Sequence, residues 1–178
     1  MESINRVSKR YALLLGFSGW FVFFSFLLRI VFLFWQLSEI DITVFNLLKI
    51  LSFGLLFDIG VLSFLFVIST LYILLVPKKY IGSIVDKIFI YFGFLVTLLI
   101  FVFTFFAEIT FWEEFKCRFN FVAVDYLIYT FEVVQNIHES YPLYILIPSM
   151  LIITGIIYFY FVKNDFFNKT FTTKISFK

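Results

Sequence analysis

Nearly uncharged hydrophobic runs alternate with short polar passages along this chain. Four runs, at about residues 11–35, 44–76, 88–111 and 143–162, are long enough to cross a membrane. A hydrocarbon core of about 30 Å needs roughly 20 apolar residues in a helix, and charge, proline or an aromatic residue bounds each run. The pattern predicts an all-α, polytopic integral membrane protein, with residues 1–178 forming a single transmembrane domain.

The composition agrees with this pattern. The chain is 62% hydrophobic, 24% aromatic and only 15% charged, and its mean hydropathy is +1.03. These values exclude a soluble globular domain of this length. Arg6, Lys9 and Arg10 precede the first run as in a signal peptide, but the run is too long and no small-residue cleavage site follows it. We therefore interpret the first run as a retained anchor.

The distribution of charge predicts the orientation. Basic residues gather before the first run, between the second and third runs, and after the fourth, whereas acidic residues gather in the other two connections. Because cytoplasmic loops are enriched in Lys and Arg, the N-terminus and the tail 163–178 are expected in the cytoplasm. The long segment 112–142 is then expected on the outer side.

Arg29 and Asp58 are charged residues of opposite sign in the first and second predicted spans. Arg29 lies six residues before Trp35, about 9 Å from the outer end of the first span at helical rise. The second run would extend to roughly 50 Å as a helix, so its first turns leave the bilayer core and Asp58 shares the outer part of the membrane with Arg29. A lone charge in the core costs about 2.5 to 3.5 kcal/mol on insertion scales. We therefore predict that Arg29 and Asp58 are near neighbours.

Two interpretations of this pair remain open. It is either a structural ion pair that holds the first two spans together, or a site at which Arg29 binds a lipid phosphate through its guanidinium. The second span also contains Gly54 and Gly60, small residues at which helices are expected to pack closely.

The passage 111–142, FWEEFKCRFNFVAVDYLIYTFEVVQNIHESYP, is the long polar and aromatic part of the chain. Glu114 precedes Arg118 by four residues, which predicts a helical salt bridge. Apolar residues from 119 to 137 recur with a period close to 3.6, which predicts an amphipathic helix lying along the outer membrane surface. Its acidic residues, Asp125, Glu132 and Glu139, recur at seven-residue intervals on one face, which we interpret as solvated.

The residues that carry enzyme chemistry do not form a set. His138 is the only histidine and lies in a charged turn, and Cys117 is the only cysteine, so the chain offers no disulfide and no CxxC motif. The carboxylates near them lack the histidine or cysteine ligands of a persuasive metal site. Phosphate-binding loops and nucleic-acid patches are also missing from the sequence. We expect no catalytic residue, metal or cofactor in this chain.

The run EFKCRFNFVAVDYLIYTFEVVQNIHESYP, the GLLFD stretch around Asp58 and the apolar run after Pro142 carry a resemblance. They resemble the membrane region of bacterial lipoteichoic-acid-synthase-like proteins, of the sulfatase and alkaline phosphatase superfamily. The specific parts are RFNFVAVDYLIYT and ESYP. Members of this family are metal-dependent transferases that move a phosphoglycerol or phosphoethanolamine headgroup from a membrane phospholipid onto an acceptor, using a domain outside the cytoplasmic membrane.

The resemblance implies a chain that anchors such a transferase in the bacterial cytoplasmic (inner) membrane and presents the lipid. The chain lacks the catalytic domain and the fifth membrane helix typical of the family, so we expect an N-terminal fragment, a truncated gene product or a shortened relative. The implied partners are a membrane phospholipid and an extracytoplasmic catalytic domain or partner protein. The residues expected at the headgroup or domain interface are Arg29, Asp58, Trp112, Glu113, Arg118, Asn120, Asp125 and Tyr126.

Two other functions remain open at this stage. The chain could be a stand-alone, non-catalytic scaffold or regulatory protein that docks a partner through the outer amphipathic helix. A small transporter using Arg29 and Asp58 in a polar pathway would be expected to show broken helices or internal repeats, which the spans lack.

Overall fold

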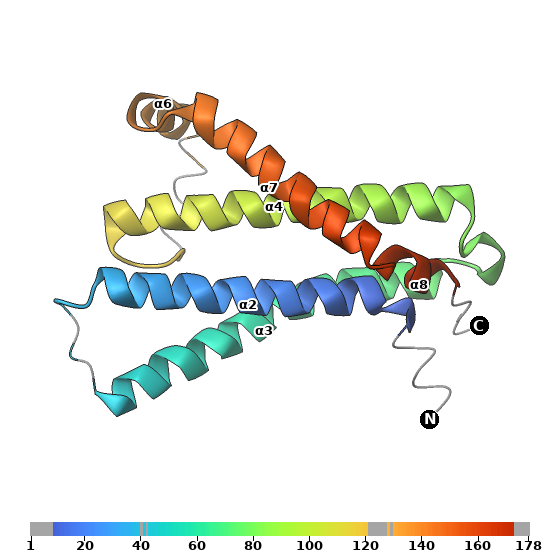
Figure 1. The fold of residues 1–178 in the computed structure, drawn as a ribbon, viewed down its shortest axis with the longest axis horizontal. Coiled ribbons are helices and arrows are strands. Elements are labelled where there is room, and N and C mark those ends of the chain that lie inside the picture. Colours follow the sequence, from blue (N-terminus) through green and yellow to red (C-terminus); the bar gives the residue numbers. More distant parts are fainter. Residues whose placement is uncertain (1–8, 40, 42, 121–127, 129, 173–178) are drawn as a thin grey trace. The chain divides into compact units, whose positions relative to one another are not determined.

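A computed structural model describes residues 9–39, 41, 43–120, 128 and 130–172. These residues form helices and no strand. The helices are α2 (Ala12–Trp35), α3 (Val44–Leu75), the 3-10 helix η1 (Lys78–Tyr80), α4 (Ile84–Phe115), α6 (Thr130–Ser140), α7 (Leu143–Lys163) and α8 (Phe166–Thr172) (Figure 1). In this part of the chain α2, α3, α4 and α7 are long and apolar enough to cross a membrane. The prediction of an all-helical, multi-pass membrane protein is confirmed at this level.

The bounds of α3 follow from its flanking residues. At its start the Thr43 hydroxyl accepts a hydrogen bond from the Asn46 N–H at 3.2 Å, which satisfies one of the free amide groups of the first turn. At its end Val76 is extended, with ψ 117°, because the residue before Pro77 is disfavoured in the helical region. The helix therefore agrees closely with the predicted span 44–76.

Helix α4 is longer than the predicted span 88–111 by about one turn at each end. The Ser83 hydroxyl accepts a hydrogen bond from the Asp86 N–H at 3.3 Å, so the helix begins before the apolar stretch does. At the other end Lys116 has φ 52°, a left-handed conformation that commonly terminates helices. The hydropathy pattern marked the apolar part of this helix and not its capping residues.

The chain forms two compact units, one from residues 1–87 with 165–178 and the other from Ile88–Asn164. In the first unit α2 packs against α3 and α8, and it buries Leu13, Phe17, Leu28 and Phe32. Helix α8 adds the buried Phe167 and Phe171 to this unit.

In the second unit α4 and α7 meet through aromatic rings. The centroid of the Phe94 ring lies 4.9 Å from that of Phe161 and 6.2 Å from that of Tyr158. These are favourable separations for aromatic pairs. Phe161 is fully buried, so this pair belongs to the packed part of the unit.

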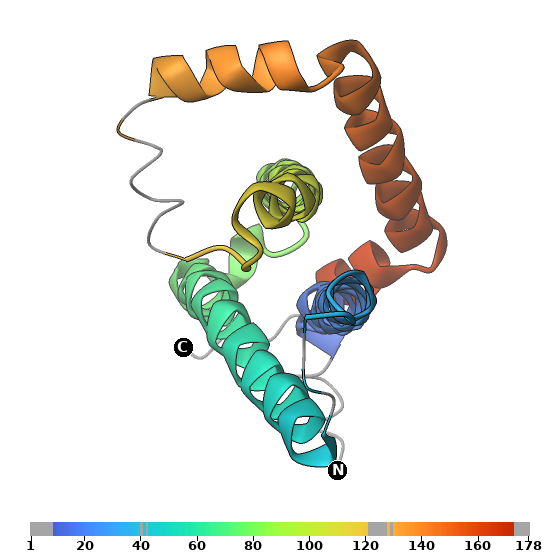
Figure 2. The ribbon, with the colours of Figure 1, turned by 90° about the vertical axis from the view of Figure 1, so that its left-hand side faces the viewer.

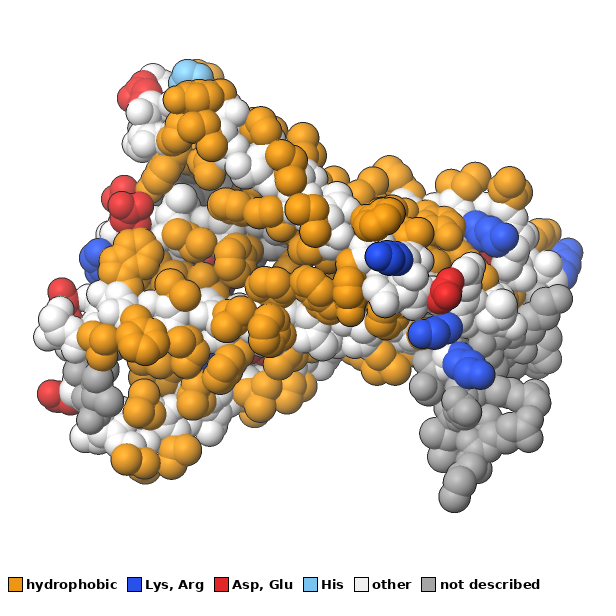
Figure 3. Space-filling view, in the orientation of Figure 1, with side chains coloured by type: hydrophobic (Ala, Val, Ile, Leu, Met, Phe, Trp, Pro, Cys, Tyr) orange, Lys and Arg blue, Asp and Glu red, His pale blue; other side chains and the backbone are white. Residues whose placement is uncertain are grey.

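Hydrophobic side chains also cover the surfaces of the long helices (Figure 3). On α3, Phe57 is 71% exposed and Phe64 is 76% exposed. Large apolar patches of this kind are rare on proteins that face water, whereas lipid tails are a suitable solvent for them. The exposed residues therefore support the same conclusion as the helix lengths.

Helix α6 overlaps the second half of the predicted amphipathic helix 119–137 and extends beyond it to Ser140. Phe119 and Asn120 are not helical, residues 121–127 and 129 lie outside the described part of the chain, and α6 runs from Thr130 to Ser140. A sharp bend at Tyr141 and Pro142 then separates α6 from α7 (Figure 2). The location of this helix at a membrane surface remains a prediction.

Candidate functional site

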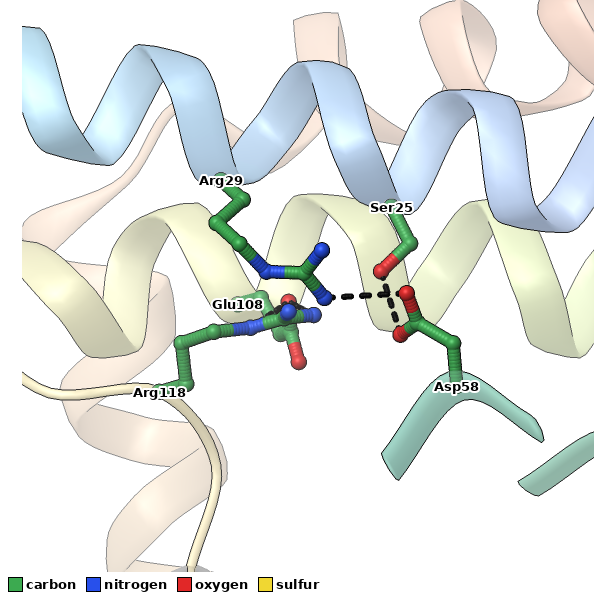
Figure 4. Close-up of polar contacts among 5 residues, drawn as sticks. All are labelled: Ser25, Arg29, Asp58, Glu108 and Arg118. Atoms are coloured by element: carbon green, nitrogen blue, oxygen red, sulfur yellow. Dashed lines mark hydrogen bonds and ion pairs between the residues drawn. The ribbon is translucent and has the colours of Figure 1, made fainter. Parts of the chain in front are cut away.

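The predicted pairing of Arg29 with Asp58 is confirmed. The Arg29 Nη2 donates to Asp58 Oδ2 at 2.9 Å, and the Ser25 hydroxyl donates to Asp58 Oδ1 at 2.6 Å (Figure 4). The side chains of Arg29 and Asp58 are each only 6% exposed. Both carboxylate oxygens therefore have a donor, as a buried charge requires.

A glycine makes room for this pair. Ser25 and Arg29 are one helical turn apart on α2, and Gly54 and Asp58 are one turn apart on α3, so the two pairs of positions face each other. A Cβ atom added to Gly54 would lie 2.1 Å from Arg29 Nε and 2.2 Å from its Cζ. The guanidinium can lie across α3 only because Gly54 has no side chain.

Gly60 has no such close neighbour among the described residues. A Cβ there would meet no atom within 4 Å among the described residues. The prediction of close packing is therefore confirmed for Gly54 and stays a prediction for Gly60, which lies on a different side of the same helix.

The geometry of the Arg29–Asp58 pair favours its structural interpretation. The Arg29 guanidinium already donates a hydrogen bond to Asp58, and its side chain is only 6% exposed. It therefore has little surface with which to contact a lipid headgroup. A buried pair of this kind is costly to break, because removal of one partner leaves the other charge unpaired. Its main effect is to hold α2 against α3 in one register.

A second ion pair lies at the carboxyl-terminal end of α4. The Arg118 Nε and Nη2 atoms both donate to Glu108 Oε2, at 3.1 Å and 2.6 Å (Figure 4). The Arg118 side chain is 32% exposed and the Glu108 side chain 12% exposed. Arg118 therefore folds back along the helix that precedes it and keeps part of its surface accessible.

This pair corrects the predicted salt bridge between Glu114 and Arg118. An (i, i+4) bridge needs a continuous helix, but α4 ends at Phe115 and Lys116 has left-handed backbone angles. Arg118 consequently lies beyond the helix and reaches Glu108. The partner of Arg118 therefore differs from the predicted one, and its place at a headgroup or domain interface stays a prediction.

Trp112 and Glu113 lie on the last turn of α4, where Trp112 is half-buried and Glu113 is exposed. The pKa of Tyr141 is raised above its ordinary value, first by burial and then by the negative charges of Glu113 and Glu114. A hydrogen bond with Glu113 adds to this effect. The turn between α6 and α7 therefore lies close to the end of α4 within the second unit.

The remaining predicted interface residues are less well defined. Asn120 is exposed, and its amide Nδ2 lies 3.4 Å from the sulfur of Cys117. Asp125 and Tyr126 lie outside the described residues. The structure thus brings Trp112, Glu113 and Arg118 to one end of α4.

A buried cluster around Asp86 was not predicted from the sequence. Its Oδ1 accepts a hydrogen bond from the Tyr72 hydroxyl at 2.6 Å, and its Oδ2 accepts one from the Gly82 N–H at 2.8 Å. Arg10 Nη2 lies 3.6 Å from Oδ1, with both side chains 1% exposed. Arg10 Nη1 donates to the Thr170 carbonyl at 2.9 Å. The cluster ties together the start of α2, the end of α3, the start of α4, and α8.

One signal in the sequence could have indicated this cluster. Asp86 is an acidic residue in a connection whose other charged residues are lysines, whereas Arg10 belongs to the basic group that predicts the orientation. Helix α8 also lies in the predicted tail 163–178, where no helix was expected. No local sequence pattern indicates that Thr170 contacts Arg10 and Leu13 at the start of α2.

Among the described residues, no group of three or more His, Cys, Asp or Glu side chains is placed to hold a metal ion. Comparison with protein-family models gives no match, and comparisons with curated proteins and with solved structures give no significant match. The resemblance to lipoteichoic-acid-synthase-like proteins therefore stays a prediction that rests on RFNFVAVDYLIYT and ESYP.

Proposed function

We propose that this chain is the membrane anchor and lipid-presenting part of a headgroup transferase that resembles lipoteichoic-acid-synthase-like proteins. In this proposal the chain is not catalytic by itself. It holds a phospholipid substrate near an extracytoplasmic catalytic domain, which transfers phosphoglycerol or phosphoethanolamine to an acceptor. The observation that carries the proposal is the resemblance of the segment 118–130, with ESYP at 139–142.

Two structural features support the proposal. Arg118, the first residue of the segment 118–130, forms an ion pair with Glu108 near the end of a candidate spanning helix. The partly exposed guanidinium at this point has the chemistry to contact a phosphate. A membrane anchor also needs helices that pack in a defined register, and the buried Arg29–Asp58 pair fixes the register of α2 against α3.

The proposed location is the bacterial cytoplasmic membrane, with the N-terminus in the cytoplasm. In the first unit Lys79 lies on η1, Lys87 in the first turn of α4 and Lys169 on α8, whereas Glu39 and Asp41 lie in the connection between α2 and α3. The positive-inside rule then assigns the lysine-bearing end to the cytoplasm. The α2–α3 turn and the segment 112–142 face outward in this orientation.

We further propose that α6 lies along the outer membrane surface. Phe131 is 78% exposed and Ile137 is 40% exposed, whereas Gln135 and Glu139 form a polar pair with a hydrogen bond of 3.0 Å. Helices that carry exposed apolar residues beside a polar face bind the boundary between headgroups and acyl chains. Such a helix would separate the bilayer from a catalytic domain.

Headgroup turnover in native membranes tests the proposed function. Removal of phosphoglycerol or phosphoethanolamine from a phospholipid leaves diacylglycerol, so labelled phosphatidylglycerol and phosphatidylethanolamine should release labelled diacylglycerol. We expect this release to fall when the gene is deleted and to return when it is restored. Unchanged release from both lipids in the deletion strain would contradict the proposal.

The exposed apolar residues of α6 also suit a second function, that of a stand-alone scaffold that docks a partner protein. A photoactivatable residue in place of Phe131 distinguishes the two. Crosslinks to lipid agree with the interfacial helix, and a crosslink to one protein of defined mass agrees with the scaffold.

A further inference from the structure

Exposed apolar surface meets exposed lysines where α3 ends and α4 begins. Leu75, at the end of α3, is 78% exposed, and η1 follows it with Lys79 and Tyr80 on the surface. In the first turn of α4, Lys87 is exposed beside Ile84, which is 75% exposed. Apolar residues on the outside of spanning helices suit lipid tails, whereas Lys and Tyr are typical of the headgroup level. The boundary between hydrocarbon and headgroups therefore lies near Lys79 and Lys87.

The two lysines lie over aromatic rings and not beside carboxylates. The ammonium of Lys87 is 5.9 Å from the centre of the Phe171 ring on α8, and that of Lys79 is 4.8 Å from the centre of the Tyr80 ring. Neither lysine forms an ion pair with a carboxylate of the described residues. A cation over a ring at an exposed site gains only about 0.5 to 1 kcal/mol. Both ammonium groups can therefore still bind an anion.

The fold keeps the nearest carboxylate in the sequence away from this surface. Asp86 is the one acidic residue in the passage 76–88 and directly precedes Lys87. It is only 2% exposed, because its oxygens accept the two hydrogen bonds described above and face the guanidinium of Arg10. The Arg10 side chain is buried with it. Burial thus removes one negative and one positive charge from the surface and leaves the lysines uncompensated there.

Asp165 is a carboxylate that stays exposed on the first unit near α8. It directly precedes α8, and its Oδ1 accepts a hydrogen bond from the Asn168 Nδ2 at 2.7 Å. Phe171, the ring beneath Lys87, lies in the last turn of the same helix. Six residues of helix correspond to about 9 Å, and charges on the surface are screened over about 8 Å in physiological salt. The positive charge of Lys87 is therefore little reduced by Asp165.

The apolar neighbours of the lysines select the partner. Leu75 and Ile84 need lipid tails around them, and a phospholipid brings its headgroup to the adjoining lysines at the same time. A soluble polyanion would leave this apolar surface uncovered. The phosphate of phosphatidylcholine is balanced by the cation of its own headgroup, whereas a lipid with a net negative charge attracts each nearby lysine by ~1 kcal/mol.

We propose that Lys79 and Lys87 bind the headgroups of anionic phospholipids. The buried Arg10 takes no part, although it belongs to the same basic region of the molecule. This surface lies in the leaflet that the proposed orientation assigns to the cytoplasm. The inference does not depend on the transferase, because it concerns the lipids that surround the membrane helices and not a substrate.

Photocrosslinking beside the lysines tests the proposal. The full chain, with benzoylphenylalanine in place of the exposed Ile84, is reconstituted in nanodiscs of phosphatidylglycerol and phosphatidylcholine, and the captured lipid is identified by mass spectrometry. We expect phosphatidylglycerol to be captured above its share of the bilayer. Lys79→Gln and Lys87→Gln should each lower this enrichment by up to about fivefold, the factor that corresponds to ~1 kcal/mol. The double variant should capture the two lipids in their bulk ratio.

Two controls separate a local site from an effect of charge in general. Lys79→Arg and Lys87→Arg keep the positive charge and should keep the enrichment. Lys49→Gln removes the same charge from an exposed position in the second turn of α3, thirty residues from Lys79, and should leave the capture at position 84 unchanged. Raising the salt concentration should lower the enrichment in the chain with both lysines intact, which requires no variant to fold.

The outcomes decide the proposal without reference to headgroup turnover. Capture of phosphatidylglycerol in its bulk ratio, or an enrichment that survives both glutamine substitutions, would overturn it. An equal loss in Lys49→Gln would also overturn it, since the effect would then follow the net charge of the chain. Enrichment that depends on Lys79 and Lys87 would retain the site even if deletion of the gene left diacylglycerol release unchanged.

Discussion

Gly54→Ala is the sharpest perturbation of the contact between α2 and α3. The added methyl would lie 2.1 Å from Arg29 Nε and 2.2 Å from Cζ, whereas non-bonded carbon atoms prefer about 3.5 to 4.0 Å. The guanidinium must therefore move by more than about 1 Å. Its hydrogen bond to Asp58, 2.9 Å long, cannot survive such a displacement unchanged.

Two opposing terms set the magnitude. Breaking a buried ion pair by displacing one partner costs about 3 to 5 kcal/mol, because the remaining carboxylate is left without its counter-charge. Alanine in place of glycine within a helix returns about 0.8 to 1 kcal/mol. We therefore expect Gly54→Ala to lower the free energy of unfolding by about 2 to 4 kcal/mol.

Gly60→Ala is the matched control, because it lies on the same helix and its added methyl meets nothing within 4 Å. It should be neutral or stabilise by up to about 1 kcal/mol. Unfolding in mixed micelles, followed by circular dichroism as the fraction of denaturing detergent rises, measures both variants. The cost of Gly54→Ala should disappear in an Arg29→Met background, since no guanidinium remains to be displaced.

Either of two results would contradict this role of Gly54. If Gly54→Ala and Gly60→Ala were equally stable, the close approach of Arg29 to α3 would have no energetic weight. If Gly54→Ala cost the same with and without Arg29, its effect would come from another contact.

Further predictions concern the other charged contacts. Asp58→Asn should lower stability in the same micelle assay, and unchanged folding and membrane insertion would remove the main support for the buried pair. Asp86→Asn leaves a buried guanidinium without its counter-charge, so α8 should become more susceptible to limited proteolysis, whereas unchanged cleavage would contradict the role of the cluster. If the chain anchors a headgroup transferase, Arg118→Ala should reduce headgroup turnover in a full-length relative, and unchanged turnover with unchanged membrane abundance would exclude Arg118 from the interface. Because the pKa of Tyr141 is raised, the unfolded chain releases this proton first and stability should fall as the pH rises past about 10. In the Glu113→Gln variant the pKa of Tyr141 should be lower, which NMR of labelled tyrosine measures. The signal of Tyr141 is the one that disappears in Tyr141→Phe.

The spanning helices could be predicted because one physical constraint dominates them. A backbone in lipid must satisfy its own hydrogen bonds, so a sufficiently long apolar run has to be helical. The pair of Arg29 and Asp58 was predictable for a similar reason, since the cost of a lone charge in the core demands a partner. Asp58 is the one acidic residue in the first two predicted spans, which made it the expected partner of Arg29.

The contacts that depend on register or on a helix end could not be predicted in this way. The role of Gly54 requires knowing which residue of α2 faces it, and the partner of Arg118 depends on α4 ending at Phe115. Arg10 and Thr170 are 160 residues apart, and no local pattern relates them. Hydropathy reports the solvent around a helix and carries no information on such contacts.

The mass of the native gene product in its source membranes tests the proposed role of the chain most directly. An antibody against residues 113–139 would detect it by immunoblot. The proposal predicts a band several times the 21.2 kDa of this chain, because a catalytic domain would be joined to the membrane anchor. A band near 21.2 kDa would contradict a covalently joined transferase and favour the stand-alone scaffold.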